Sequence, residues 1–375
     1  MIIQETEAKS ILRKKKKIDS WFISHYSMNL YRGCSFNCAY CDGRNEKYFV
    51  QGEFDKNIIV KKNAIDVLHK ELTPSKRKYP LKRSYIMPCG GVGDSYEPIE
   101  KKYQLTRKTL ELLYEFNFPV HILTKSVLVK RDVDILQKIN RQSRAIISFS
   151  FSTVDDNISK IFEPNAPLPS ERLETISFFK ERGFSCGIFL MPVIPFITDT
   201  PQMMDETISK AKEAGAEFVI FGGMTLKEGR QKEHFLNVLG KKFPHLMLEY
   251  ENIYKDDNWG NATKEYYNTI NFTFDLVAKK YKIPKRIPPY LYNTVLNEND
   301  LVIVILEHID YLLKLKNYKS NFGYAAYKIS QLNTSVSAIR TELKRINGIG
   351  ETIKKIILEI IDTGTSKYYE KLLIG

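Results

Sequence analysis

The chain has 375 residues, of which 43% are hydrophobic and 27% are charged. This composition is that of an ordinary globular protein, and the length favours two or three domains. The apolar runs fall short of the roughly 18–20 residues that a membrane span needs, and residues 1–20 are charged where a secretory signal would be apolar. We therefore expect a cytoplasmic protein with no membrane partner.

The formal net charge is +13, and a strongly basic balance favours polyanion partners, chiefly nucleic acid. The alternative is a lysine-rich protein whose charges are only solvated. Residues 1–25 form a basic N-terminal segment that contains the run Arg13-Lys-Lys-Lys-Lys17. We expect this run to be a flexible solvated arm.

From residue 26 to about 225, apolar strands alternate with helical patterns. The expected strands are Ser27–Tyr31, Ser84–Cys89, Val120–Thr124, Ala145–Phe151, Ser185–Pro192 and Phe218–Met224. The expected helices are Ala64–Leu72, Leu105–Glu115, Arg131–Asn140, Ser170–Arg182 and Gln202–Ala214. Gly183 and Gly215 stand just past the last two helices, where glycine often ends a helix. The alternation predicts a parallel sheet of six βα units, an α/β fold in the form of a partial (β/α)6 TIM-like barrel.

The rest of the chain is predicted to be helical. Residues 226–282 continue as a helical extension, which assigns 26–282 to the barrel. The basic, proline-rich stretch 283–296 is expected to be a linker. Residues 297–375 have their own apolar helical periodicity and predict a small all-α C-terminal domain.

Three of the five cysteines, Cys34, Cys38 and Cys41, fall within eight residues in the pattern C-x3-C-x2-C. Cysteine thiolates hold [4Fe–4S] clusters, and three thiolates leave one of the four irons open to a small molecule. A zinc site is the structural alternative, but structural zinc takes four ligands, and the nearest histidine is His25. Because the loop follows the first strand, we expect it at the carboxyl ends of the strands, where barrels of this type carry their chemistry.

The cysteine pattern is the signature of radical S-adenosylmethionine (SAM) enzymes, and further motifs extend the likeness. They are Asn29-Leu-Tyr-Arg-Gly-Cys34, Gly93-Asp-Ser-Tyr-Glu-Pro-Ile-Glu100, Leu105-Thr-Arg107, Leu123-Thr-Lys-Ser126, Arg131-Asp132, Glu163-Pro-Asn-Ala-Pro167, Arg172-Leu173 and Met191-Pro-Val-Ile-Pro195. Over residues 20–290 the chain resembles the spore photoproduct lyase-like branch of that superfamily, also known as DNA repair photolyase-like.

The resemblance implies two cofactors, a [4Fe–4S] cluster held by the three cysteines and SAM bound at its open iron. It also implies a low-potential electron donor, whose electron cleaves SAM and releases a 5′-deoxyadenosyl radical. That radical removes a hydrogen atom from the substrate. In the photoproduct lyase the substrate is a cross-linked thymine pair, which then separates.

The resemblance also assigns cofactor contacts. Tyr40 precedes the last cysteine, where an aromatic residue commonly lies near the adenine; the alternative is packing beneath the loop. Lys125 and Ser150 match cofactor-contacting positions, and they suit the SAM carboxylate and a ribose hydroxyl; alternatively they are ordinary polar residues at strand ends. Asp94 lies where the methionyl amino group is often bound, although the segment Gly90-Gly-Val-Gly-Asp94 lacks the usual Gly-Gly-Glu form.

Other positions have more open roles. The lyase returns a hydrogen atom to its product from a cysteine at the end of its second strand, and Cys89 lies on the corresponding strand, two residues earlier than the alignment on Asp94 requires. Its alternative role is that of a small buried apolar residue. Glu163 and Arg172 are expected to be either an ion pair at the barrel rim or direct ligands. Cys186 is expected in the core.

The C-terminal stretch Ile346-Asn-Gly-Ile-Gly350 lies between two helical patterns and resembles a helix-hairpin-helix element. Gly348 and Gly350 would let a phosphate approach the backbone, the following helix offers N–H groups and a positive dipole end, and Lys354 and Lys355 could add contacts. Such contacts position DNA without reading its sequence. The alternative is a plain glycine turn between helices.

Residues 297–375 as a whole resemble the small N-terminal domain of family X DNA polymerases. Its matching segments are Leu306-Glu-His-Ile-Asp-Tyr-Leu-Leu313, Asn321-Phe-Gly-Tyr-Ala-Ala-Tyr327 and Tyr369-Glu-Lys-Leu-Leu373. Some such domains cleave abasic sites through a lysine, but Ile356 occupies the matching position here and Lys355 is only adjacent. The resemblance therefore implies DNA binding rather than that cleavage.

Taken together, these features predict a radical SAM enzyme that repairs a DNA lesion, with a pyrimidine photoproduct as the expected substrate and a base flipped out of the duplex. Two alternatives stay open. One is a radical SAM enzyme that modifies RNA or tRNA bases, and the other is a non-enzymatic DNA-binding protein with a structural iron–sulfur cluster.

Overall fold

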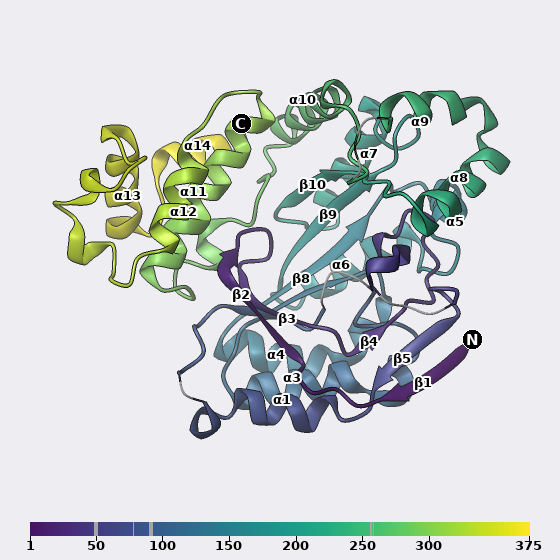
Figure 1. The fold of residues 1–375 in the computed structure, drawn as a ribbon, viewed down its shortest axis with the longest axis horizontal. Helices are drawn as coiled ribbons and strands as arrows, with labels where there is room; N and C mark the ends of the chain where they lie inside the picture. Colours follow the sequence, from purple (N-terminus) through teal and green to yellow (C-terminus); the bar gives the residue numbers. More distant parts are fainter. Residues whose placement is uncertain (49–51, 78, 90–92, 256, 258) are drawn as a thin grey trace.

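A mixed sheet forms the centre of the molecule (Figure 1). The computed structural model describes residues 1–48, 52–77, 79–89, 93–255, 257 and 259–375, and within them seven strands join in the order β10-β9-β8-β7-β6-β3-β2. Their bounds are β2 Leu12–Asp19, β3 Ser24–Met28, β6 Tyr85–Met87, β7 Val120–Thr124, β8 Ala145–Phe151, β9 Ser185–Val193 and β10 Val219–Gly223. The six strands from β3 to β10 are parallel, and β2 runs antiparallel to β3. The predicted α/β fold with six parallel strands is confirmed.

Helices connect the parallel strands and cover the sheet, which explains why the inner strands are apolar along their whole length. Strand β8 is buried at six of its seven positions. The connecting helices are α1 Ala64–Leu72, α2 Glu100–Tyr103, α3 Leu105–Glu115, α4 Val133–Gln142, α5 Asp156–Phe162, α6 Pro169–Lys180 and α7 Pro201–Glu213. Gly183 and Gly215, which follow α6 and α7, both have positive φ, as expected of glycines that end helices.

The first parallel strand differs from its prediction. The expected strand Ser27–Tyr31 is replaced by β3 at Ser24–Met28 and by the two-residue strand β4, Tyr31–Arg32. Strand β3 begins with polar residues that are nevertheless buried, because Ser24 Oγ donates to the Tyr85 carbonyl at 2.6 Å and His25 Nε2 lies 2.9 Å from Asp300 Oδ2. Apolar periodicity does not detect a strand of this kind.

The prediction of a flexible N-terminal arm is wrong. Residues Ile2–Thr6 form β1, which pairs with β5 (Asn57–Lys61) in a three-stranded sheet, β1-β5-β4. Residues Leu12–Asp19 form β2, so the Arg13–Lys17 run is part of the central sheet. The buried side chains of Leu12 and Ile18 anchor the two ends of this strand.

The segment after the sheet forms three helices, α8 Arg230–Lys242, α9 Met247–Ile253 and α10 Lys264–Lys280. The stretch 283–296, expected to be a linker, is packed against the barrel. The side chain of Arg286 is 1% exposed, and its guanidinium carbon lies 4.3 Å from the Trp21 ring centroid and 3.4 Å from that of Tyr311. These cation–π contacts bind the stretch to both the N-terminal segment and the helices that follow.

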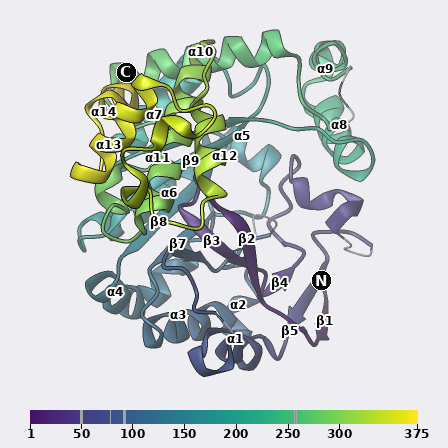
Figure 2. The same ribbon diagram turned by 60° about the vertical axis from the view of Figure 1, so that its left-hand side comes forward.

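The C-terminal residues form α11 Glu298–Leu315, α12 Phe322–Ser330, α13 Glu351–Thr363 and α14 Lys367–Ile374. We refer to residues 297–375 as the helical tail. It lies beyond β2 on one side of the sheet, and α8 and α9 lie on the opposite side (Figures 1 and 2). His308 fixes the tail to the barrel, since its Nε2 is 2.7 Å from the Ser20 carbonyl and its Nδ1 is 2.7 Å from the Tyr369 hydroxyl. Among the described residues, every helix is too short or too polar to cross a membrane.

Candidate active site

The cysteine loop lies at the carboxyl end of the sheet, as predicted. Cys34, Cys38 and Cys41 line one cavity of about 400 Å³. Gly33 makes the entry to this loop possible, because its φ is +88° and a Cβ there would come within 2.3 Å of the Asn57 carbonyl oxygen. Two of the thiols are buried and that of Cys41 is partly exposed.

Several long-range hydrogen bonds fix the loop. The Ala39 N–H donates to the Phe162 carbonyl at 2.7 Å, and Arg44 Nε donates to the Cys38 carbonyl at 3.2 Å. Gln231, which is fully buried in α8, donates from Nε2 to the carbonyls of Tyr40 at 3.1 Å and Thr225 at 3.0 Å. Hydrogen bonds from distant elements therefore hold the loop in place.

The three thiols fit a cluster better than a single ion. Each stands as a thiol or thiolate without a disulfide, and among the described residues no group of three or more His, Cys, Asp or Glu side chains converges on a point suited to one metal ion. Three thiolates would leave one of the four ligand positions of a structural zinc site unfilled, whereas three thiolates and an open iron suit a [4Fe–4S] cluster that binds a small molecule. Burial raises the pKa of all three thiols, that of Cys38 to about 12, so they need metal charge to ionise.

A buried charge network forms one wall of the cavity. The Tyr40 hydroxyl donates to Glu163, which also forms a close ion pair with Arg172. Ser152 Oγ donates to the same carboxylate at 3.0 Å, and Lys125 Nζ lies 3.9 Å from it. Burial alone would raise the pKa of Glu163, but the two cations outweigh it and lower the pKa to about 2. The ion-pair role expected for Glu163 and Arg172 is confirmed.

Lys125 and Ser150 are adjacent at the carboxyl ends of β7 and β8. Lys125 Nζ donates to Ser150 Oγ at 2.6 Å and lies 5.7 Å from the Tyr40 ring centroid. Ser150 Oγ also donates to the Met191 carbonyl at 3.3 Å. Both residues, together with Tyr40, line the same cavity as the cysteines.

Asp94 also lines the cavity, but protein donors already surround its carboxylate. It accepts hydrogen bonds from Thr124 Oγ1 at 2.6 Å, the Lys125 N–H at 2.7 Å and the Tyr96 N–H at 2.9 Å. Burial raises its pKa despite these bonds. Asp94 therefore ties the loop after β6 to the end of β7. Residues 90–92 of the predicted Gly-Gly-Val-Gly-Asp motif lie outside the described residues.

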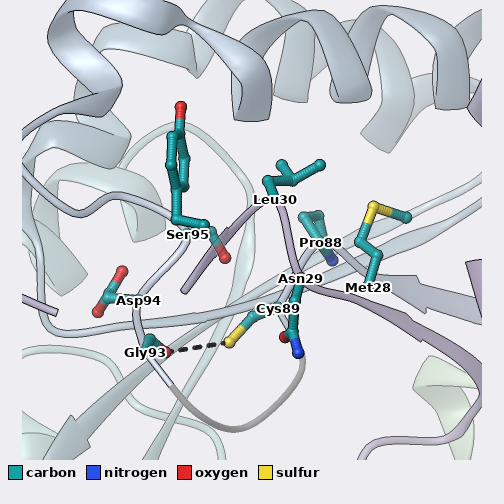
Figure 3. Close-up of a pocket in the computed structure, with 9 residues that line it drawn as sticks. Met28, Asn29, Leu30, Pro88, Cys89, Gly93, Asp94 and Ser95 are labelled. Atoms are coloured by element: carbon teal, nitrogen blue, oxygen red, sulfur yellow. Dashed lines mark hydrogen bonds between the residues drawn. The ribbon is translucent and has the colours of Figure 1, made fainter. Parts of the chain in front are cut away.

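Cys89 follows β6 and lies near Asn29, with its sulfur directed toward Gly93 (Figure 3). Its side chain is buried, it lines the main cavity with the three loop cysteines, and it also lines a smaller hollow with Met28 and Asn29. The Sγ atom is 3.5 Å from the Gly93 carbonyl oxygen. Cys186, by contrast, is fully buried within β9, as expected.

The residues expected to bind DNA are remote from this cavity. Gly348 has a φ of +92°, and Gly350 precedes α13, on whose first turns Lys354 and Lys355 lie. The stretch before the turn forms short 3-10 helices, Ser337–Ile339 and Leu343–Arg345. Helix α13 projects at the far end of the helical tail (Figure 1). The structure thus groups the predicted cofactor residues and leaves the predicted DNA-binding residues apart.

Sequence reasoning missed several residues of the site. Gln231 links the cysteine loop to the segment after β10, and Thr225 adds to the cavity wall. Gln231 is separated from Tyr40 by 191 positions, so the contact exists only in the folded chain. A lone glutamine in a helix has no local signal that marks such a role.

Comparison with known proteins agrees with this geometry. Residues 28–211 match the sequence model of the Radical SAM superfamily. An uncharacterized protein of Mycobacterium tuberculosis (strain ATCC 25618 / H37Rv), Rv2578c, is 29% identical over 234 residues, which are 61% of this chain and 67% of the relative. An uncharacterized protein of Methanocaldococcus jannaschii, MJ0683, is 29% identical over 228 residues, 60% of this chain and 81% of the relative.

Solved structures of spore photoproduct lyase mutants share the fold. One superposes with a TM-score of 0.56 at 15% identity, over 74% of this chain and 79% of the lyase. Another, with dinucleoside spore photoproduct, has a TM-score of 0.51 at 17% identity, over 72% and 78%. Residues 28–211 of this chain are therefore a radical SAM domain, which belongs to a superfamily whose members use a [4Fe–4S] cluster and SAM.

Proposed function

We propose that this radical SAM enzyme acts on DNA and repairs a pyrimidine photoproduct by removing a hydrogen atom from the lesion. One observation carries the proposal: Cys89 lines the same cavity as the three loop cysteines, in a fold shared with spore photoproduct lyase. A thiol there could reach a substrate radical formed beside the cofactors. The solved lyase structure with dinucleoside spore photoproduct supports the substrate class.

The residues around the cavity suit the two cofactors of the superfamily. Cys34, Cys38 and Cys41 would hold the cluster, and Tyr40 would pack beside the adenine. When bound, the cluster and SAM supply a 5′-deoxyadenosyl radical that removes a hydrogen atom from the substrate. The remaining tasks, orientation of the substrate and exclusion of water, fall to the protein.

Lys125 and Ser150 are the proposed partners of the SAM carboxylate and ribose. Lys125 is a suitable cation because Glu163 stabilises its charge from one side while its ammonium group points toward Ser150. Arg172, which bonds to Glu163 and donates to the Ser150 carbonyl at 2.9 Å, keeps the carboxylate in place. Asp94 is the proposed partner of the methionyl amino group. Its two oxygens already accept three hydrogen bonds, so its contribution there would be mainly its negative charge.

Cys89 is the proposed hydrogen-atom donor to the product. Its S–H bond would break as a C–H bond forms on the repaired base, which leaves a thiyl radical on sulfur. One electron from the low-potential donor and one proton would restore the thiol. The cysteine must therefore be close to the substrate, and its place in the lining of the main cavity supports this role.

Two features support DNA as the polymer. The net charge of +13 favours a polyanion, and the Gly348–Gly350 turn before α13 suits a phosphate. Lys354 and Lys355 would add contacts to the backbone. Because the cavity lies at the barrel's carboxyl end, a damaged base would have to leave the duplex to reach it.

The test is anaerobic turnover with reconstituted cluster, SAM, a reductant and ultraviolet-irradiated DNA, followed by nucleoside analysis. We expect 5′-deoxyadenosine to form and the photoproduct to decrease. Cys89→Ala should still form 5′-deoxyadenosine but should yield little repaired thymine. Activity confined to RNA would favour base modification instead, and an absence of 5′-deoxyadenosine from the wild-type enzyme would leave only a structural cluster.

A further inference from the structure

The basic run Arg13–Lys17 lies in a strand at the edge of the central sheet. The sequence predicts a flexible arm there. Strand β2 is the last strand in the sheet order and pairs with β3 alone. Arg13, Lys14 and Lys16 are exposed, whereas Lys15 and Lys17 are partly buried and form ion pairs with Asp19 and Glu307. Within the described part of the chain, the three exposed cations have no carboxylate partner in ion-pair distance.

Two further cations, Arg32 on β4 and Lys61 on β5, accompany this strand. Burial, followed by repulsion from Arg32 and Arg13, lowers the pKa of Lys61 to about 8, although the negative charge of Glu71 acts in the opposite direction. Repulsion among these cations exceeds the attraction of Glu71, and a bound anion would relieve it. We call Arg13, Lys14, Lys16, Arg32 and Lys61 the basic track.

The nearby carboxylates Glu71, Glu5 and Glu7 lie beside Arg32 and Lys61, and in the described part of the chain none is within ion-pair distance of the exposed cations of β2. Glu71 accepts hydrogen bonds from the N–H groups of Ile11 at 3.1 Å and Leu12 at 2.8 Å. Glu5 and Glu7 line a cavity of about 510 Å³ together with Arg32 and Lys61. Glu5 accepts from the Tyr103 hydroxyl at 2.8 Å, and Glu7 is 3.8 Å from Lys62.

The strand that carries most of the track runs between the neighbourhood of the cysteine loop and the helical tail. Strand β2 begins opposite Met28, at the carboxyl end of β3, and Arg32 is two residues before Cys34. At its other end, Lys17 contacts Glu307 of the helical tail. Figure 1 shows β2 running from beside the helical tail toward the region of α1 and α3. Eight residues of strand span roughly 26 Å, about the rise of seven or eight base pairs.

We propose that the basic track binds the sugar-phosphate backbone of the DNA on which the cavity acts. This inference rests on the proposed function for the identity of the polymer. The exposed cations of β2 follow one another along an edge strand, where residues two apart are spaced by about 6.6 Å, and this spacing suits neighbouring phosphates. A membrane surface is a poorer match, since surface-bound segments also insert apolar side chains, and β2 presents only basic residues between Leu12 and Ile18.

Edge strands also use lysines to prevent pairing with other chains. That role does not account for the track, because Arg32 and Lys61 lie on other strands and add to the repulsion. The possibility that these lysines prevent pairing between chains calls for one control. A variant without the lysines must be shown to be monomeric before its binding is compared.

The experiment uses the full chain with Arg13→Gln, Lys14→Gln and Lys16→Gln combined. The matched control is Lys101→Gln, Lys108→Gln and Lys138→Gln, which removes three exposed lysines from α2, α3 and α4. Binding to a short labelled undamaged DNA duplex is measured between about 50 and 200 mM salt. We expect the track variant to bind at least about tenfold more weakly, with a log–log salt slope smaller by about 2–3. The control should change neither slope nor melting temperature.

Equal affinity and slope for wild type and monomeric track variant would overturn the inference, even if all proteins repair irradiated DNA. Loss of binding only to phosphatidylserine vesicles would overturn it as well. Conversely, weaker DNA binding by the track variant supports the track even if irradiated DNA is not repaired, and in that case the proposed repair reaction alone fails.

Discussion

The charged side chains of the cavity are buried, whereas those at the far end of the helical tail are exposed to solvent. At the cavity, Glu163 and Arg172 are fully buried and each bonds to several partners. At the tail turn, Lys344 pairs with Glu351 and Arg345 with Glu342, and all four side chains are more than half exposed. Buried charge networks are costly to break, whereas exposed pairs contribute about 0–1 kcal/mol. The cavity is therefore preorganised, and the tail turn depends on a few solvated groups.

The largest effect should come from the cysteine loop. Cys38→Ala removes one of three cluster ligands, so we expect loss of most bound iron and of all 5′-deoxyadenosine formation. Iron and sulfide analysis after anaerobic reconstitution measures this. Cys186→Ala is the control, because Cys186 is also buried but lies within β9, and it should retain the cluster. A fully active Cys38→Ala enzyme would refute the ligand assignment.

The second effect tests the buried network. Glu163→Gln keeps the size of the side chain but leaves Arg172 and Lys125 without their negative partner. We expect a loss of about 3–5 kcal/mol in the free energy of unfolding, measured with denaturant. Glu181→Gln, at an exposed pair with Arg182, should cost less than about 1 kcal/mol. Similar losses for both variants would mean that the cavity is no more preorganised than the surface.

Much of the barrel could be predicted because its signals are local. Helices α1 and α3 have the predicted bounds, and β7 and β8 also coincide with their predictions. Their apolar residues recur with the period of the element, and turn residues separate them. The cysteine loop, Lys125 and Ser150 then follow, because parallel strands bring their carboxyl ends to one edge.

The remaining features depend on contacts between distant residues. His25 and Ser24 are polar residues in a buried strand because Asp300 and Tyr85 provide hydrogen bonds. The Arg13–Lys17 run is a strand because Leu12 and Ile18 are buried at its ends. Gln231 reaches the cysteine loop from α8. Composition and periodicity describe neighbours in sequence, so these roles were not visible in them.

The third prediction concerns how the tail is attached. Burial lowers the pKa of His308 to about 3, against about 6.5 in an unfolded chain. The unfolded state therefore binds more protons below pH 6.5, and stability falls by up to about 1.4 kcal/mol per pH unit from there toward pH 3. His121, whose pKa burial lowers to about 4, adds to this dependence in the barrel.

Measurements of unfolding free energy between about pH 5 and 7 check this sign. His308→Gln should flatten the pH dependence, whatever its effect on stability at neutral pH. His245→Gln, at an exposed site, should leave the slope unchanged. An unaltered slope in His308→Gln would show that the tail interface does not keep this histidine neutral.

The smallest expected effect is at the tail turn. Substitutions there distinguish Gly348, which the turn needs for its structure, from Gly350, which is proposed to approach a phosphate. A Cβ on Gly348 would lie 2.4 Å from Tyr324 Cδ1, at a backbone φ of +92°, whereas a Cβ on Gly350 meets nothing within 4 Å. Gly348→Ala should therefore lower the melting temperature, while Gly350→Ala should cost at most about 1 kcal/mol.

If a phosphate approaches the start of α13, the Gly350→Ala methyl group would obstruct it. We expect DNA binding about three- to tenfold weaker in titrations, equivalent to about 0.7–1.4 kcal/mol, with 5′-deoxyadenosine formation unchanged. Wild-type affinity in this variant would mean that the turn serves only to join helices. The exposed charges of β2 would then remain as the proposed DNA contact.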